Sequence, residues 1–456
     1  MKSWLDSVKV YLDRRMLVIF LLGFSSGMPS PLIFANLSVW LKDAGLSRTS
    51  IGVFGLVGTA YAVNFLWAPL VDRLRLPVLG RLMGQRRSWA MLSQIVLFAA
   101  IASMGMMHPE TQIFGLALAA VAVSFSSATQ DIVIDAYRIE RLTPEEYAAG
   151  SAVGVAGWLL GAAVVGFTGL YLVSYFDWNT AYLASSGFVL VGFLTILFCR
   201  EPDRRAADTG SAMESEVAAR LQGMGRVSQA LANYGSWFYG AVIAPFVDFF
   251  RRLGWTALVI LIFVVLYKTG EAMLGRMAFV FYREIGFDHT QIADVSKVLG
   301  TVATVSGLLL GGILGKRFGV LPALLVSGIL MAATNLTYAW LATAGKDESV
   351  FMVAVFADNL TSGMATTTFV AYLSSLCNLA YTATQYALLA SLGNFARIQF
   401  AAVAGWMVDS LNGDWATFFI MTAIIAIPGL ALLIWMMRRF PPQGTRAETP
   451  IEDTAD

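Results

Sequence analysis

Twelve long apolar runs limit what this chain can fold into. Each run approaches or exceeds the roughly 20 residues that an α-helix needs to cross the hydrocarbon core of a bilayer. Hydrophobic residues make up 57% of the chain and charged residues only 13%, whereas soluble domains carry about 25% charged residues. The runs are 16–41, 50–71, 89–107, 111–137, 147–171, 180–199, 255–282, 291–315, 320–343, 350–376, 381–408 and 415–437. The sequence therefore predicts an all-α membrane protein with 12 transmembrane helices.

Basic residues orient these helices, because Lys and Arg accumulate in cytoplasmic loops. With a cytoplasmic N-terminus, 23 of the 31 Lys and Arg residues fall in inner segments, four in outer segments and four within spans. Both termini are then cytoplasmic. The first apolar run is too long for the core of a cleavable signal. We expect a cytoplasmic N-terminal segment over 1–15, a six-helix half over 16–199, a cytoplasmic linker over 200–254, a second six-helix half over 255–438 and a disordered cytoplasmic tail over 439–456.

One uncharged stretch, Val227–Val247, is long enough to be a thirteenth crossing. A single added crossing would invert the second half and place Lys316, Arg317, Arg438 and Arg439 outside, against the positive-inside rule. We therefore interpret 227–253 as an amphipathic helix that lies on the inner membrane surface.

The two halves repeat each other at a nearly constant offset. Gly45–Gly52 aligns with Gly286–Ala293, and Ser126–Tyr137 aligns with Thr361–Tyr372. Six crossings per half return the chain to its starting side, so the repeats run parallel. Substrates of such proteins bind between the halves near the middle of the membrane.

The repeat also shows which charges the fold can do without. The aligned pairs are Gln130 with Ala365, Asp131 with Thr366, Asp135 with Val370, Lys268 with Gly27, Glu271 with Ser30, and Arg397 with Trp158. At each of these positions the aligned residue of the other half is uncharged. We therefore expect the charged residues to have a role in function and not in folding.

Acidic residues on one face of the 111–137 helix are the first candidates for proton coupling. Ser127, Asp131, Asp135 and Arg138 follow one another at helical spacing. A charged side chain at membrane depth is costly and usually faces a cavity or a partner. The alternative is a static Asp135–Arg138 pair at the inner headgroup level.

The helix over 255–282 carries Lys268 and Glu271 one turn apart. In the functional interpretation, Lys268 pairs across the cavity with a carboxylate of the 111–137 helix, and substrate or a proton breaks this pair. In the alternative, the two residues neutralise each other within their helix. Tyr267 and Arg276 belong to the same region, and we assign them to substrate binding.

Further polar residues outline a cavity suited to hydroxyls, amides and a carboxylate. They are Asn36, Tyr61, Asn64, Asn394 and Arg397. Taken singly, any of them could instead form a hydrogen bond between packed helices.

A basic loop follows the second span. Asp72-Arg73 precedes Gly84-Gln85-Arg86-Arg87, and an acid at a helix end beside such a cluster can latch the two halves together on the inner side. We also assign Arg138 to this latch. The loop resembles the G-x-x-x-D-R-x-G-R-R loop of the major facilitator superfamily, with Ala68 in place of the leading glycine.

Four segments resemble the AmpG family of muropeptide permeases. They are Ala128–Ala136, Val265–Glu271, Trp67–Arg73 and Ala244–Phe250. The resemblance implies the major facilitator fold and proton-coupled import of N-acetylglucosaminyl-anhydro-N-acetylmuramic acid, with or without peptide, across a bacterial inner membrane. It implies coupling and binding roles for Gln130, Asp131, Asp135, Lys268 and Glu271.

Other functions remain open at this stage. Acetyl-coenzyme A transporters share the 128–136 pattern in looser form, although several phosphates would call for a more basic cavity. A sensor that binds the fragments without moving them is a second alternative. An enzyme is disfavoured, because His108 and His289 both lie in predicted outer loops. We expect no cofactor, no metal and no nucleic-acid partner, and a monomer in the lipid bilayer with muropeptide and protons as ligands.

Overall fold

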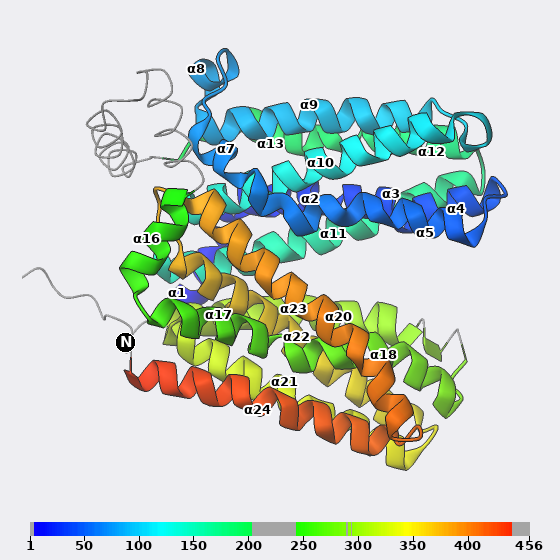
Figure 1. The fold of residues 1–456 in the computed structure, drawn as a ribbon, viewed down its shortest axis with the longest axis vertical. Coiled ribbons are helices and arrows are strands. Elements are labelled where there is room, and N and C mark those ends of the chain that lie inside the picture. Colours follow the sequence, from blue (N-terminus) through cyan, green and yellow to red (C-terminus); the bar gives the residue numbers. More distant parts are fainter. Residues whose placement is uncertain (1–3, 203–242, 289–290, 293, 440–456) are drawn as a thin grey trace, which may run out of the picture.

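The computed structural model describes residues 4–202, 243–288, 291–292 and 294–439, and these residues form helices and connecting loops without a strand. Figure 1 shows two layers of helices, one from each half of the chain. Nine helices in the described part are long and apolar enough to cross a membrane. The fold is that of an all-α membrane protein, as predicted.

The first half begins with α1 (Trp4–Lys9) and η1 (Val10–Leu12), which precede the first crossing. The first crossing consists of α2 (Arg14–Gly27), α3 (Pro29–Ile33) and α4 (Ala35–Asp43), and the second of α5 (Arg48–Phe54), η2 (Gly55–Gly58), α6 (Thr59–Val63), η3 (Asn64–Leu66) and α7 (Ala68–Arg73). The third, fourth and fifth crossings are single helices, namely α9 (Gln85–Gly105), α10 (Pro109–Arg141) and α11 (Tyr147–Val173). The sixth crossing consists of α12 (Trp178–Ser186) and α13 (Val189–Phe198). The short α8 (Leu79–Met83) and η4 (Pro144–Glu146) lie in connections.

The second half repeats this plan. Its crossings are α17 (Thr256–Tyr267) with α18 (Thr269–Ile285); η6 (Asp294–Leu299) with α20 (Gly300–Phe318); α21 (Val320–Ala344); α22 (Glu348–Leu376); α23 (Thr382–Ser410); and α24 (Trp415–Arg439). All twelve predicted spans coincide with these helices to within a few residues. The three that fall outside the nine apolar helices are the broken second crossing and the more polar α22 and α23.

The first crossing breaks where the sequence carries a reason to break. The helix α2 ends just before Pro29 and Pro31. It ends there because proline lacks the backbone N–H that would continue the hydrogen bonds of the helix. The seventh crossing is interrupted at Lys268, which separates α17 from α18. Interrupted helices near the middle of the membrane mark binding sites in transporters.

Glycines allow close contacts between helices. A Cβ atom at Gly157 of α11 would lie 2.1 Å from the backbone oxygen of Phe20 in α2. A Cβ atom at Gly307 of α20 would equally overlap the backbone of Leu360 in α22. These contacts fix α11 against α2 and α20 against α22, as small residues do in membrane bundles.

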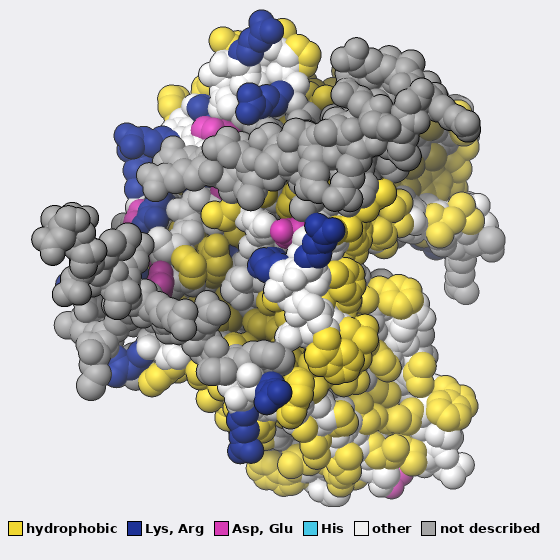
Figure 2. Space-filling view, turned by 60° about the vertical axis from the view of Figure 1, so that its left-hand side comes forward, with side chains coloured by type: hydrophobic (Ala, Val, Ile, Leu, Met, Phe, Trp, Pro, Cys, Tyr) yellow, Lys and Arg dark blue, Asp and Glu magenta, His cyan; other side chains and the backbone are white. Residues whose placement is uncertain are grey.

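One end of the molecule carries most of the basic side chains, and we call it the basic end. Figure 1 places the N-terminus and the end of α24 there, together with α8 and α16 (Ala244–Leu253). Figure 2 shows Lys and Arg side chains spread over this end, whereas hydrophobic side chains cover the flank of the bundle. The positive-inside rule assigns the basic end to the cytoplasm.

The predicted surface helix over 227–253 is described only in part, because 227–242 lie outside the described residues. Within α16, Phe249 is buried and Phe250 is exposed. Arg252 donates a hydrogen bond to the backbone oxygen of Leu376 at the end of α22. This part of the segment therefore packs on the basic end of the second half.

Candidate substrate and proton sites

Asp131 faces a small pocket between the two halves, which we call the Asp131 pocket. The pocket has a volume of about 240 Å³. Residues of the first half line it together with Val370 of α22 and Tyr386 of α23. Ser26 Oγ of α2 donates a hydrogen bond of 2.6 Å to Asp131 Oδ1. Among the described residues no cation forms an ion pair with Asp131, so this acid is held by one hydroxyl.

Asp135 lies in the same pocket and has a cationic partner. Arg138 Nη2 is 3.0 Å from Asp135 Oδ1, and the Arg138 side chain is only 4% exposed. Arg138 Nη1 also donates to Ser151 Oγ at 2.7 Å and to Ser374 Oγ of the other half at 3.2 Å. The pair named as the alternative in the sequence analysis is therefore present, and its arginine also bridges the halves.

Lys268 and Glu271 form an ion pair with each other. Lys268 Nζ lies 2.7 Å from Glu271 Oε2 and 5.1 Å from the centre of the Phe369 ring. The predicted pair between Lys268 and a carboxylate of α10 is wrong for this conformation. Lys268 and Glu271 are three residues apart and lie on one helical face, so the local partner is the nearer one.

This ion pair can be tested by neutralising one side and then both. We expect Lys268→Gln alone to lower uptake more than tenfold, because it leaves Glu271 without its cation in a low-dielectric site. If the pair only neutralises itself, the double variant Lys268→Gln/Glu271→Gln should recover most of the lost uptake. A double variant as inactive as the single one would show that a charge itself is needed. Initial uptake rates at equal protein density measure this.

Asp358 of α22 is a site residue that the sequence analysis missed. It lines a pocket of about 580 Å³ with Glu271, Asn359 and Arg397, which we call the Asp358 pocket. Tyr338 Oη donates to Asp358 Oδ2 at 3.3 Å, and the hydroxyls of Tyr282 and Tyr338 lie 2.9 Å apart. The sequence could have indicated Asp358 as a site residue, because it is an acid within the predicted span 350–376, just as Asp131 is an acid within 111–137.

The Asp358 pocket brings together four polar side chains, those of Glu271, Asp358, Asn359 and Arg397. Ser362 Oγ donates to Glu271 Oε1 at 3.4 Å. Arg397 is exposed and has no ion pair with any residue that the structure describes. Carboxylates, an amide, hydroxyls and one guanidinium thus face one volume in the second half. The side chain of Arg276 lies outside the described part.

Two predicted binding residues are buried within single halves. Gln130 Oε1 accepts a hydrogen bond of 2.7 Å from Gln94 of α9, and Gln130 Nε2 donates to Ser25 of α2. Tyr267 is 4% exposed, donates to the backbone oxygen of Leu324 and stacks on Phe369. Neither side chain belongs to the lining of the Asp131 pocket or the Asp358 pocket, and these contacts are with helices of its own half.

The remaining predicted binding residues are spread along the bundle. Asn36 is buried against α11, and neither of its amide atoms has a hydrogen-bond partner among the described residues. Tyr61 is partly buried beside Phe34. Asn64 accepts a hydrogen bond from Ser391 of the other half, and Asn394 is exposed on α23. Within the part of the chain that the structure describes, Asn64 is the one of these four that has a hydrogen bond to the other half.

The residues assigned to the latch meet around Asp72 at the basic end. Asp72 accepts hydrogen bonds from the backbone N–H groups of Ala383 and Thr384, at 3.2 and 2.8 Å, and from Thr384 Oγ1 at 2.7 Å. These groups form the first turn of α23, whose unpaired N–H groups and dipole favour an anion. Arg86 Nη2 holds the other side of the carboxylate at 2.7 Å.

Other basic residues of the loop support this latch. Arg86 is fully buried and also binds Glu140 of α10. Arg73 lies 5.4 Å from the centre of the Tyr381 ring in the other half. Arg87 instead donates to the backbone oxygens of Ile196 and Leu197 in its own half.

Glu201 caps the start of α9 beside these arginines. It accepts hydrogen bonds from the backbone N–H groups of Arg86 and Arg87. Burial raises the pKa of Glu201, and the two backbone hydrogen bonds oppose this shift. The cap therefore fixes the position of the helix end that carries Arg86.

Comparison with known proteins identifies close relatives of the whole chain. The profile of the Major Facilitator Superfamily matches residues 15–399 and 278–453. The anhydromuropeptide permease of Escherichia coli K12 is 37% identical over 94% of this chain and 80% of its own length. A transporter of Rickettsia felis named AmpG 4 is 32% identical over 94% of this chain and 98% of its own. The proton:xylose symporter XylE has the same fold, with a TM-score of 0.62 at 13% identity over 94% of this chain and 95% of XylE.

Proposed function

Because this chain belongs to the AmpG family within the major facilitator superfamily, we propose that it imports anhydro-muropeptides by proton symport and alternating access. The substrate is N-acetylglucosaminyl-1,6-anhydro-N-acetylmuramic acid, with or without peptide. It moves from the periplasm to the cytoplasm across the inner membrane, where the fragments return to peptidoglycan synthesis.

The observation that carries the proposal is the acid pair at the junction of the halves. Asp131 has a hydroxyl partner and Asp135 shares Arg138 with Ser374 of the other half. A change in the contact between the halves would alter the surroundings of both acids. Such a change moves the affinity for a proton, which is what coupling requires.

The charge of the two pockets favours a sugar fragment over a polyanion. The Asp131 and Asp358 pockets together contain four carboxylates and two guanidiniums. Several phosphates, as in acetyl-coenzyme A, would meet repulsion from most of these groups. A disaccharide with a single carboxylate can use the amide, the hydroxyls and an arginine as hydrogen-bond partners.

Uptake into proteoliposomes tests this function directly. With the outside more acidic than the inside, labelled N-acetylglucosaminyl-anhydro-N-acetylmuramic acid should accumulate inside the proteoliposomes. A protonophore should lower the ratio of the inside to the outside concentration to one. Acetyl-coenzyme A should not compete. Binding without accumulation would favour a sensor instead, and accumulation of acetyl-coenzyme A would favour the related transporter class.

A further inference from the structure

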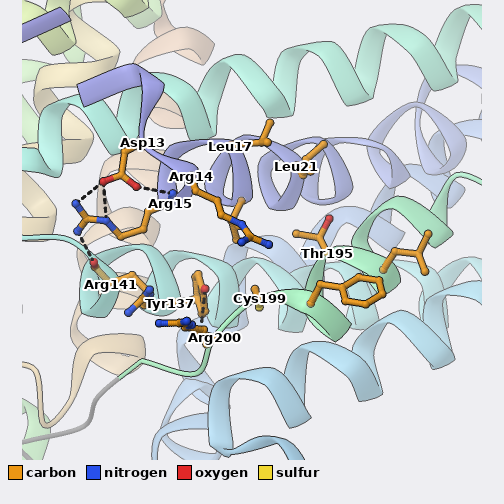
Figure 3. A pocket seen from close by; sticks show the side chains of 13 residues that line it. Asp13, Arg14, Arg15, Leu17, Leu21, Tyr137, Arg141, Thr195, Cys199 and Arg200 are labelled. Atoms are coloured by element: carbon orange, nitrogen blue, oxygen red, sulfur yellow. Dashed lines mark hydrogen bonds and ion pairs between the residues drawn. The ribbon is translucent and has the colours of Figure 1, made fainter. Parts of the chain in front are cut away.

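A pocket on the first half, at the basic end, has features that the transport cycle does not explain. It has a volume of about 650 Å³ and lies between the start of α2 and the ends of α10 and α13. Four arginines line it, namely Arg14, Arg15, Arg141 and Arg200. Figure 3 shows Arg14 reaching from α2 into the pocket, with Arg200 and Tyr137 at its other wall.

Most of the positive charge in this pocket is uncompensated. Arg15 Nη2 lies 2.7 Å from Asp13 and 2.8 Å from Glu146. Within the described residues, no carboxylate forms an ion pair with the other three arginines. Among the described residues of the lining Asp13 is the only acid, so four guanidiniums face one carboxylate there.

The rest of the lining is apolar and exposed. Leu17 of α2 is 57% exposed, and Leu194 and Phe198 of α13 are 49% and 73% exposed. All three belong to the pocket lining. A ligand that fits must therefore carry an anion at one end and a long apolar part beside it.

We infer that this pocket binds an anionic phospholipid of the inner leaflet. The guanidiniums suit a phosphate, to which arginine donates paired hydrogen bonds. The apolar side chains would lie along the acyl chains, and the pocket lies at the end of the bundle where anionic lipids attract basic groups. A soluble phosphate would use only the arginines and would leave the apolar wall uncovered.

Native mass spectrometry of the full-length chain in detergent tests this site. We expect phosphatidylglycerol to bind at least tenfold more tightly than phosphatidylcholine. Arg14→Gln/Arg200→Gln should raise the Kd for phosphatidylglycerol about thirtyfold, from two arginines near an anionic headgroup. Both side chains are exposed, so the variant should fold.

Three comparisons make the result decisive. Arg438→Gln/Arg439→Gln removes two charges at the same end but outside this pocket, and should leave the Kd unchanged. Phe198→Ser should weaken phosphatidylglycerol binding through the acyl chain. Glycerol phosphate, which has the headgroup charge without chains, should not bind at millimolar concentration. A lipid preference that survives in the Arg14/Arg200 variant, or equal binding of glycerol phosphate, would overturn the inference.

Discussion

Replacing Asp131 by Asn is expected to abolish proton-driven accumulation of muropeptide. With one proton per substrate, an inward gradient of one pH unit supports about tenfold accumulation, since 1.36 kcal/mol corresponds to a factor of ten. An amide keeps the size of the side chain and the hydrogen bond from Ser26 Oγ, which is 2.6 Å long in the native protein. It cannot bind and release a proton, so the inside-to-outside ratio should fall to about one.

Counterflow separates loss of coupling from loss of the protein. Exchange of labelled for unlabelled substrate at equal pH needs binding and alternation but no net proton movement. We therefore expect Asp131→Asn to retain exchange. Asp409→Asn, an exposed acid on α23, is the matched control and should accumulate substrate as the native chain does. If Asp131→Asn accumulates substrate fully, the proton-carrying residue is Asp135 or Glu271 instead of Asp131.

The long apolar runs and the loop charges were sufficient to predict the helices. Each of the twelve predicted spans coincides with a helix or a broken helix, and the break at Pro29 and Pro31 follows from backbone chemistry alone. The latch around Asp72 was also predictable, because an acid at a helix end beside an arginine cluster has few other uses.

The side-chain partners were harder to predict, because they depend on how helices rotate against each other. Gln130 is part of the most specific family segment, yet it is turned toward Gln94 within its own half. By sequence, Lys268 could pair with Glu271 or with a carboxylate of α10, and in the structure it pairs with Glu271, three residues away. Asp358 could be seen only by counting acids in every span, since the aligned position of the first half gives no signal for a pocket.

Replacing Asp72 by Asn is expected to open the basic end. The native carboxylate joins Arg86 to the backbone N–H groups of Ala383 and Thr384 in the other half. Asparagine has no negative charge for the Arg86 guanidinium and the two N–H groups to bind. Its NH₂ group is itself a donor, so it cannot accept a hydrogen bond from them. A hydrogen bond to a charged group contributes about 1.5–3 kcal/mol, so losing two of the bonds that cross between the halves is enough to shift a two-state equilibrium about a hundredfold or more. Uptake should fall at least tenfold, because the carrier then spends little time closed at this end.

The distance between spin labels on Arg75→Cys and Leu379→Cys measures this opening. Both positions are exposed and lie in opposite halves beside the latch, and Cys199→Ser/Cys377→Ser removes the native thiols. We expect a longer distance in Asp72→Asn than in the parent. Asp248→Asn is the matched control, because Asp248 accepts hydrogen bonds from Gln385 and Asn378 and joins α16 to α23 without crossing to the first half.

An unchanged distance in a folded Asp72→Asn protein would show that other contacts keep the basic end closed. The contact of Arg138 with Ser374 is one such connection between the halves. That result would have a consequence for coupling, because Arg138 is also the partner of Asp135. Opening the basic end would then require Arg138 to leave Ser374, and the same movement would change the charge environment of Asp135. Ser374→Ala in the same labelled background would distinguish the two arrangements, since it removes the contact across the halves and leaves the Asp135–Arg138 pair in place.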